Sequence, residues 1–140
     1  MNSSLTRVLF LTIAQVFFTQ IIYAQNISGS WEWSESSEDR TFHVTLSKPT
    51  SKNSQAINYD LIGKHCGVYY NGGRIDCAEE TSIFLKKESD NIFTGTIQSN
   101  YSEEISEIRL VYSPETDQIN WQVIKGKGQF YFPHEAILKK

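Results

Sequence analysis

Short alternating segments, separated by loops of turn-forming residues, constrain the fold more than any other feature of this chain. In residues 41–46, Phe42, Val44 and Leu46 share one parity and polar residues occupy the other. The same period of two recurs in residues 57–61, 93–97, 108–112 and 119–124. Apolar side chains at every second position, many of them β-branched or aromatic, predict strands that are buried on one face.

The loops between these segments are short and rich in Ser, Asn, Asp, Pro and Glu. Short connections favour antiparallel neighbours, so we expect an all-β antiparallel meander of eight to ten strands. A sheet of this size must curl or close, and its single apolar face favours closure into a barrel. A two-sheet sandwich is the alternative. The tail, residues 126–140, is interpreted as a last strand interrupted at Pro133, with a short helix as the alternative.

The first 24 residues have the features of a secretory signal peptide. Arg7 precedes a mostly apolar run, and the small residue Ala24 favours cleavage after it. The run contains Thr and Gln and is short for a membrane span. Residues 25–140 are therefore expected to form one domain in the periplasm or outside the cell, without a membrane span after cleavage.

Charge and cysteine content narrow the function classes. The formal net charge is −3 and no basic cluster is present, which argues against a nucleic-acid partner. The chain has two cysteines, and an oxidising compartment would favour one disulfide between them.

Both cysteines fall in the segment GKHCGVYYNGGRIDC, residues 63–77. Asn71 and Gly72 tolerate the positive φ that a two-residue type I′ turn requires, and a turn centred on them sets Cys66 opposite Cys77. In that register the cysteines form a hydrogen-bonded pair with Cα atoms ~5.5 Å apart, within the range of a disulfide. A three-residue loop with a bulge would shift the pairing by one residue and stays open as an alternative.

The two faces of this hairpin differ in character. One face carries Cys66, Val68, Tyr70, Ile75 and Cys77, and the other carries His65, Tyr69, Arg74 and Asp76. The polar cluster of His65, Arg74 and Asp76 is expected to be a solvated face with a weak Arg74–Asp76 ion pair. A site for an anion or carboxylate is the alternative.

Reactive or metal-binding cysteines are not expected. Cys66 and Cys77 lack the spacing of zinc ligands. His65 and Cys66 are adjacent, so in a strand they point to opposite faces and do not form a Cys–His nucleophile. No hydrolase, metalloprotease or phosphate-loop motif is present. We therefore expect a protein without enzymatic activity, cofactor or metal, with a hydrolase around His65 as the minor alternative.

Aromatic residues suggest where a ligand would bind. Trp31 and Trp33 lie two residues apart and share a face of the first strand. They are interpreted as barrel filling or, alternatively, as a stacking wall for an apolar ligand. The candidate ligand-binding residues are Trp31, Trp33, Phe42, Val44, Tyr59 and Trp121.

Two resemblances accompany these patterns. The stretch ISGSWEW resembles the G-x-W first strand of lipocalins and the similar opening of avidins, through Gly29, Ser30 and Trp31. This resemblance implies an up-and-down barrel that binds a small, often apolar ligand. The signal ending in Ala-Gln, together with GSWEW, LIGKHCGVYYNGGRID and YFPHEAILKK, is similar to a family of small exported bacterial proteins that contain a domain of unknown function. That similarity implies a bacterial envelope or secreted protein and no particular activity.

The leading expectation is an exported binding module that carries a small apolar molecule. The second is an envelope protein-recognition module, such as an inhibitor or an immunity-like protein, that uses the hairpin at residues 67–74. Rigid hairpins with Tyr and Arg make good anchors, so Tyr69, Tyr70 and Arg74 are the candidate partner-binding residues.

Overall fold

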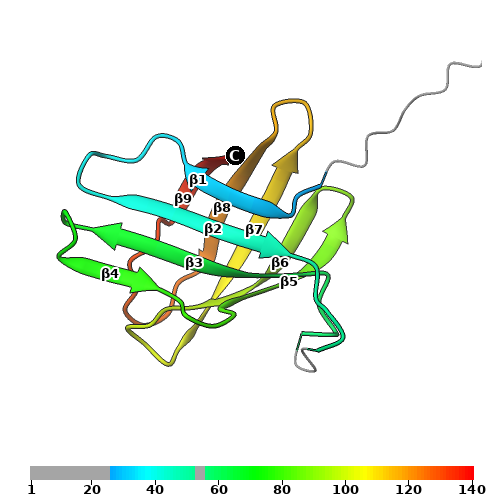
Figure 1. Ribbon diagram of the computed structural model, residues 1–140, viewed down its shortest axis with the longest axis horizontal. Coiled ribbons are helices and arrows are strands. Elements are labelled where there is room, and N and C mark those ends of the chain that lie inside the picture. The colour runs from blue at the N-terminus through cyan, green and yellow to red at the C-terminus, as the bar shows by residue number, and fades with distance from the viewer. Residues whose placement is uncertain (1–25, 53–55) are drawn as a thin grey trace, which may run out of the picture.

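The computed structural model of the chain describes residues 26–52 and 56–140. Nine strands and no helix occur in these residues (Figure 1). The strands are β1 (Gly29–Trp33), β2 (Thr41–Ser47), β3 (Leu61–Tyr69), β4 (Arg74–Cys77), β5 (Ile83–Ser89), β6 (Ile92–Gln98), β7 (Ile105–Ser113), β8 (Gln118–Lys125) and β9 (Glu135–Lys139). The expected signal peptide and its cleavage after Ala24 lie outside the described residues.

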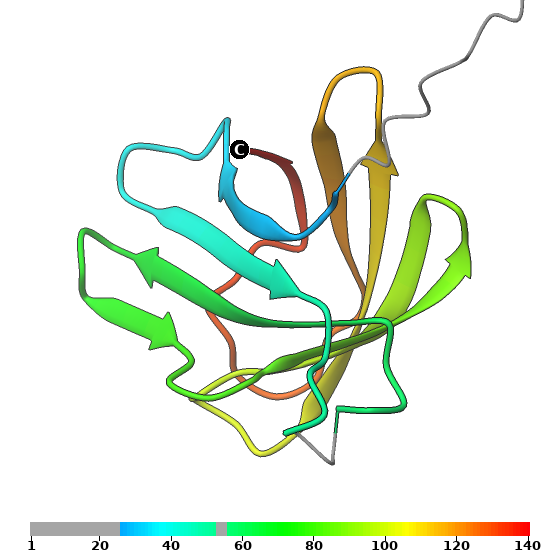
Figure 2. The ribbon, with the colours of Figure 1, turned by 45° about the vertical axis from the view of Figure 1, so that its right-hand side comes forward.

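Eight of the strands close into an antiparallel barrel (Figure 2). Neighbours pair in the order β1-β2-β3-β5-β6-β7-β8-β9, and β9 returns to β1 through the pairs Glu32↔Lys139 and Trp33↔Leu138. This confirms the closed antiparallel meander and rules out the sandwich. Strand β4 is a ninth strand that pairs with β3 beside the barrel wall.

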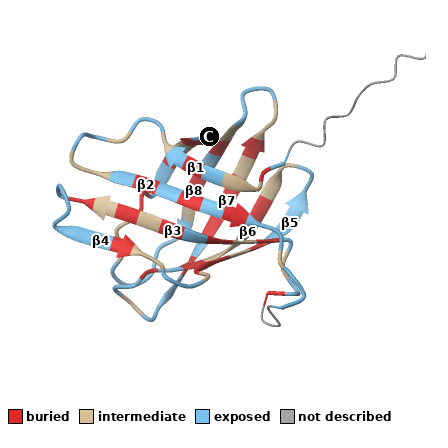
Figure 3. Cartoon of the chain, in the orientation of Figure 1, coloured by how far each residue is buried: buried red, intermediate tan, exposed pale blue. Residues whose placement is uncertain are grey.

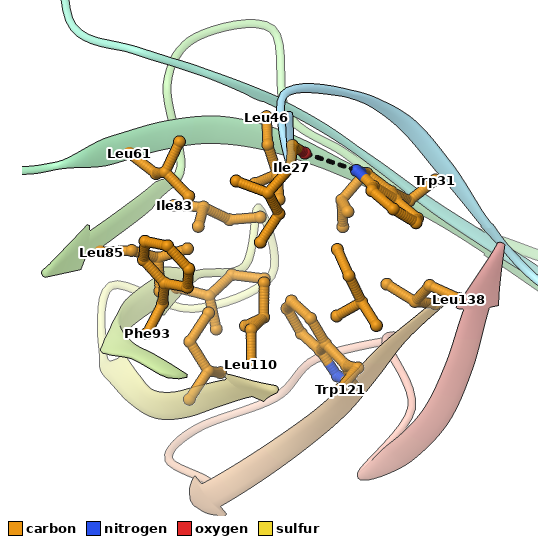
Figure 4. Close-up of a cluster of buried hydrophobic side chains, with 14 of the residues drawn as sticks. Ile27, Trp31, Leu46, Leu61, Ile83, Leu85, Phe93, Leu110, Trp121 and Leu138 are labelled. Atoms are coloured by element: carbon orange, nitrogen blue, oxygen red, sulfur yellow. Dashed lines mark hydrogen bonds between the residues drawn. The ribbon is translucent and has the colours of Figure 1, made fainter. Parts of the chain in front are cut away.

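Outside the β3–β4 hairpin, the apolar parity of each strand faces the barrel interior, as the alternation predicts (Figure 3). In β2, Phe42, Val44 and Leu46 are buried and their neighbours are exposed. The interior side chains form one cluster (Figure 4). Both buried tryptophans satisfy their indole N–H groups on backbone carbonyls: Trp31 donates to Ile27 at 2.8 Å and Trp121 to Pro133 at 2.9 Å. Such a bond allows an indole to be buried without leaving a polar group unpaired.

The structure tests the strands predicted for the tail and for residues 57–61. The tail ends in strand β9, which begins two residues after Pro133, so the strand interpretation is correct for Glu135–Lys139 and wrong for residues 126–134, which form no strand. The strand predicted over residues 57–61 is wrong, because residues 56–58 form a turn and β3 begins at Leu61. Ile57 is exposed there, because this segment has no neighbouring strand to pair with. The alternating pattern therefore extends beyond the strand that forms.

Candidate functional site

The β3–β4 hairpin lies at one end of the barrel, beside the β1–β2 loop (Figure 1). Its register is the one expected from the sequence: Cys66↔Cys77, Gly67↔Asp76, Val68↔Ile75 and Tyr69↔Arg74. Cys66 and Cys77 form a disulfide, as expected. Because the register is confirmed, the bulged alternative shifted by one residue is excluded.

The turn itself differs from the expected two-residue type. Tyr70 and Asn71 have φ of 57° and 52°, and Gly72 has φ of 92°, so the left-handed conformation extends over three consecutive residues. The backbone N–H of Ala78 donates to the His65 carbonyl at 2.9 Å. Residues 65 and 78 are therefore the hydrogen-bonded pair, and the cysteines are the closer, non-hydrogen-bonded pair with Cα atoms 3.8 Å apart.

The hairpin buries its polar face and exposes its apolar face, the reverse of what the sequence pattern suggests. Asp76 and His65 are 0% and 1% exposed, and Tyr69 is also buried. Tyr70 and Ile75, on the other face, are 59% and 57% exposed. The expected solvated polar face is therefore wrong for His65 and Asp76 and correct for Arg74, which is exposed.

Four hydrogen bonds explain how a carboxylate can be buried here. Asp76 Oδ1 accepts from His65 Nε2 at 3.1 Å and from the backbone N–H of Asn100 at 2.9 Å. Its Oδ2 accepts from Ser99 Oγ at 2.6 Å and from the backbone N–H of Tyr131 at 3.0 Å. Burial raises the pKa of Asp76, but these hydrogen bonds outweigh it and lower the pKa to about 2. The charged carboxylate thus joins the hairpin to two distant segments of the chain.

Ser82 completes this buried network at the point where β3 changes neighbours. Residues 61–63 of β3 pair with β5, and residues 66–69 pair with β4. At the fork, Ser82 Oγ accepts from the backbone N–H of His65 at 3.3 Å and lies 2.7 Å from His65 Nδ1. Ser82, His65 and Asp76 are the residue types of an acyl-transfer relay. Here, however, the serine hydroxyl accepts the His65 backbone N–H that a neighbouring strand would otherwise bind. Its geometry is that of a structural link.

Tyr131 is positioned over the hairpin by this network and by a glycine. Gly67 allows the connection between β8 and β9 to cross β3 closely, because a Cβ at this position would lie 1.8 Å from the Tyr131 carbonyl oxygen. The Tyr131 backbone N–H is bound to Asp76 at the same place. The ring of Tyr131 consequently contacts three other tyrosines, with centroids 5.9 Å from Tyr69, 6.2 Å from Tyr70 and 4.8 Å from Tyr101.

We define the hairpin patch as the exposed or half-exposed residues Tyr70, Arg74, Ile75, Tyr101 and Tyr131. Arg74 Nε donates to the Tyr131 hydroxyl at 3.2 Å, and Nη1 donates to the Gly73 carbonyl at 2.8 Å. The hydrogen bond to Tyr131 raises the pKa of Arg74. The expected ion pair between Arg74 and Asp76 is wrong, because the Asp76 carboxylate turns inward and its lone pairs are taken by the four donors.

Of the three partner-binding residues expected from the sequence, two lie in the patch. Tyr70 and Arg74 are exposed, whereas Tyr69 is buried beneath them with the Arg40 guanidinium 5.0 Å from its ring centroid. Burial raises the pKa of Tyr69 to about 12. Tyr69 therefore supports the patch from below.

The outer edge of β4 is covered, so a partner strand cannot simply be added to it. The Ile75 backbone N–H donates to the Tyr101 hydroxyl at 3.2 Å, and the Asn100 side chain donates to the Cys77 carbonyl. Covered edges protect a sheet from uncontrolled pairing. The patch is therefore available through its side chains.

The residues expected to line a ligand cavity divide into two groups. Trp31, Phe42, Val44 and Trp121 are fully buried and belong to the packed core, with the Phe42 and Trp121 rings 5.0 Å apart. Trp33 and Tyr59 are partly exposed. Tyr59 lines a hollow of about 920 Å³ together with Ile27, Leu61, Phe93 and Tyr112. Core side chains therefore meet an opening at this hollow.

Sequence reasoning missed Tyr101, Tyr131, Ser82 and Ser99. The sequence carries one signal for Tyr131, the dense aromatic stretch QFYF between Gly128 and Pro133. Tyr101 and the two serines sit in ordinary loop sequence, and tertiary contacts alone reveal their role.

Within residues 26–52 and 56–140, no helix is long and apolar enough to cross a bilayer. The same residues contain no group of three or more His, Cys, Asp or Glu side chains arranged to hold a metal ion. Comparison with protein-family models, curated proteins and solved structures finds no match to the chain.

Proposed function

We propose that this protein is an exported, non-enzymatic recognition module that binds a protein partner through the hairpin patch. The observation that carries the proposal is the inverted burial of the hairpin, which exposes Ile75 and Tyr70 while Asp76 and His65 occupy the interior. Contiguous exposed apolar side chains commonly mark surfaces that a partner covers. Tyr and Arg are also the residue types that contribute most to protein interfaces.

Rigidity supports the same proposal. The patch is fixed by three features: the disulfide, the buried hydrogen bonds of Asp76, and the close approach of the β8–β9 connection to Gly67. A preformed surface loses little conformational entropy on binding, which favours affinity. The disulfide is also consistent with an oxidising compartment and so supports the export that the leader predicts. The proposal of export also draws on the resemblance of the sequence to small exported bacterial proteins.

Site-specific photocrosslinking in the native cells tests the proposal. A benzoylphenylalanine at position 75 should give a discrete crosslinked protein. The same probe at position 124 is the matched control, because Ile124 is an equally exposed isoleucine on β8. Equal crosslinking from both positions, or none from position 75, would contradict the proposal.

A second candidate function is the transport of a small apolar molecule. The hollow beside Tyr59 supports it, since barrel mouths are common ligand sites. Native mass spectrometry of the protein from its own cells would show a retained molecule, and Phe93→Ser should abolish its retention. A bare mass for the wild-type protein would remove this candidate and leave the recognition module standing.

A further inference from the structure

Arg74 carries a positive charge that the described chain does not neutralise. Its Nε and Nη1 groups donate to a tyrosine hydroxyl and a backbone carbonyl, both uncharged. The ion pairs of the described residues join Arg40 to Asp39 and Lys87 to Asp90, and the Asp76 carboxylate is hydrogen-bonded to His65. Arg40, the other arginine at this end of the barrel, is therefore matched by a carboxylate, and Arg74 is not.

Tyr131 presents a second donor at the same point. Its hydroxyl oxygen accepts from Gln129 Nε2 at 2.8 Å and from Arg74 Nε at 3.2 Å. These two hydrogen bonds lower the pKa of Tyr131. The hydroxyl proton meets no acceptor among the described residues and remains available to a ligand. A guanidinium and a polarised hydroxyl side by side match an anionic oxygen pair.

Both donors are held in place before any ligand arrives. Tyr131 is fixed through its backbone by Asp76 and the Gly67 crossing. Arg74 is fixed by the Tyr131 hydroxyl and by the turn carbonyl of Gly73, with its guanidinium 6.0 Å from the Tyr131 ring centroid. A positioned arginine binds a carboxylate with less entropic cost than a free one.

The apolar part of the patch adjoins these donors. Ile75 follows Arg74 in β4 and is 57% exposed, and its backbone N–H binds the Tyr101 hydroxyl. The Tyr101 ring in turn contacts the Tyr131 ring. Because consecutive strand residues point to opposite faces, a ligand meets Arg74 and the Tyr131 hydroxyl on one face of β4 and Ile75 on the other, with Tyr101 at the edge between them.

We propose that the partner is a protein segment that presents a carboxylate to Arg74 and Tyr131 beside an apolar side chain that packs on Ile75 and Tyr101. Charge complementarity at Arg74 is the argument for this occupant. The inference rests on the proposed recognition function and specifies the chemistry of the partner at that same site.

A random 12-residue peptide display library, selected on the full mature protein, tests the inference directly. Selected peptides should be enriched in Asp or Glu next to a large apolar residue. Synthetic versions of these peptides should bind Arg74→Glu at least about tenfold more weakly than wild type, the scale of a lost charge-assisted hydrogen bond. Replacing the peptide's acidic residue by Lys should restore binding to Arg74→Glu. Arg109→Glu, on β7, controls for the change in net charge.

Each outcome separates the two proposals. Acidic enrichment with rescue by the charge swap supports the inference. If the selected peptides lose binding on Ile75→Ser but show no acidic enrichment and no response to Arg74→Glu, the carboxylate inference is wrong and the recognition function stands. If no selected peptide responds to Ile75→Ser, the patch is not a recognition surface and both proposals are wrong. Unchanged unfolding midpoints for the exposed-site variants confirm that each comparison concerns binding.

Discussion

Asp76 receives four hydrogen bonds from donors that lie on β3, on the β6–β7 loop and on the connection before β9. A buried carboxylate without such partners would be costly, and here every buried side-chain polar atom of the described residues is paired. Because of this network the hairpin can bury its polar face. The opposite face, with Ile75 and Tyr70, is then exposed to solvent. At the scale of single residues, the exposed hairpin patch therefore depends on a carboxylate that is not part of the patch.

The charge of Asp76 should contribute to stability in a defined pH range. Its pKa is about 2 in the folded protein against 3.8 for a free Asp, so its contribution is complete above about pH 4 and is lost as pH falls toward 2. The shift corresponds to about 2 kcal/mol of unfolding free energy. Denaturant unfolding between pH 2 and 7 should show a steeper acid loss for wild type than for Asp76→Asn.

The Asp76→Asn variant should also be less stable at pH 7 by about 3 kcal/mol, because an amide cannot accept all four hydrogen bonds. Asp90→Asn, which changes an exposed carboxylate, is the control and should keep the wild-type pH profile. Parallel pH profiles for Asp76→Asn and wild type would show that folding does not lower the pKa of Asp76.

Ile75 should contribute almost nothing to folding. Because its side chain is largely exposed, Ile75→Ala should change the unfolding free energy by less than about 0.5 kcal/mol. Ile108→Ala is the matched core variant, since Ile108 is 1% exposed, and should cost about 2–5 kcal/mol. A large loss for Ile75→Ala would mean that this side chain is part of the fold and not a free surface.

At the scale of elements, β4 is an addition to the barrel, attached to the barrel strand β3. β4 pairs with β3 and leaves the eight-stranded ring intact. Besides this pairing, β4 contacts the rest of the chain through the disulfide, the Asp76 network, the hydrogen bond from Arg74 to Tyr131, and the side chains of Asn100 and Tyr101 along its edge. Such an element can be shaped for recognition while the barrel supplies stability.

Removing the disulfide should loosen the hairpin and leave the barrel folded. The cysteines are 11 residues apart, and closing so short a loop stabilises by about 2–3 kcal/mol on the chain-entropy model. Cys66→Ala with Cys77→Ala should lower the unfolding free energy by that amount. Amide hydrogen exchange should increase in β4 and remain unchanged in β7 and β8. Equal acceleration in all strands would mean that the hairpin is required for barrel closure.

Gly67 should be required for the position of Tyr131. A Cβ at residue 67 collides with the Tyr131 carbonyl, so Gly67→Ala should displace this connection and cost about 1–3 kcal/mol of stability. Gly73→Ala is the milder comparison, because its Cβ would lie 3.2 Å from the Tyr70 carbonyl oxygen, which needs a shift of only a few tenths of an ångström. Unfolding midpoints and binding of the selected peptides should both decrease for Gly67→Ala. Wild-type binding by this variant would show that the patch does not need Tyr131 in place.

At the scale of the whole molecule, the two ends of the barrel differ. One end carries the hairpin patch and its buried polar network, and the other opens into the hollow beside Tyr59. Between them the interior is occupied by Trp31, Trp121 and their aliphatic neighbours (Figure 4). A filled interior favours recognition by the surface over storage of a ligand at the centre.

Tryptophan fluorescence should report this filled interior. Trp31 and Trp121 are 0% and 1% exposed, so iodide should quench the partly exposed Trp33 and leave the other two bright. Trp33→Phe should therefore abolish most quenching. An apolar probe such as 1-naphthylphenylamine should not change the emission of that variant. Quenching that survives in Trp33→Phe, or a response to the probe, would indicate an open interior and favour the carrier function.

The sequence by itself determined the strand alternation, the closed antiparallel class, the final strand and the pairing of Cys66 with Cys77. The strand predictions follow from side-chain parity, which acts over a few residues. The cysteine register is correct even though the turn is not the two-residue type from which it was predicted. The leader and the resemblance to exported bacterial proteins remain predictions. Only the tertiary structure decided which face of the hairpin is buried. That choice depends on Ser82, Ser99, Asn100 and Tyr131, which are distant in sequence from one or both of the groups they bind. Hydrogen bonds from distant donors outweighed the local apolar pattern, because a charged group can enter an interior when all its bonds are satisfied there.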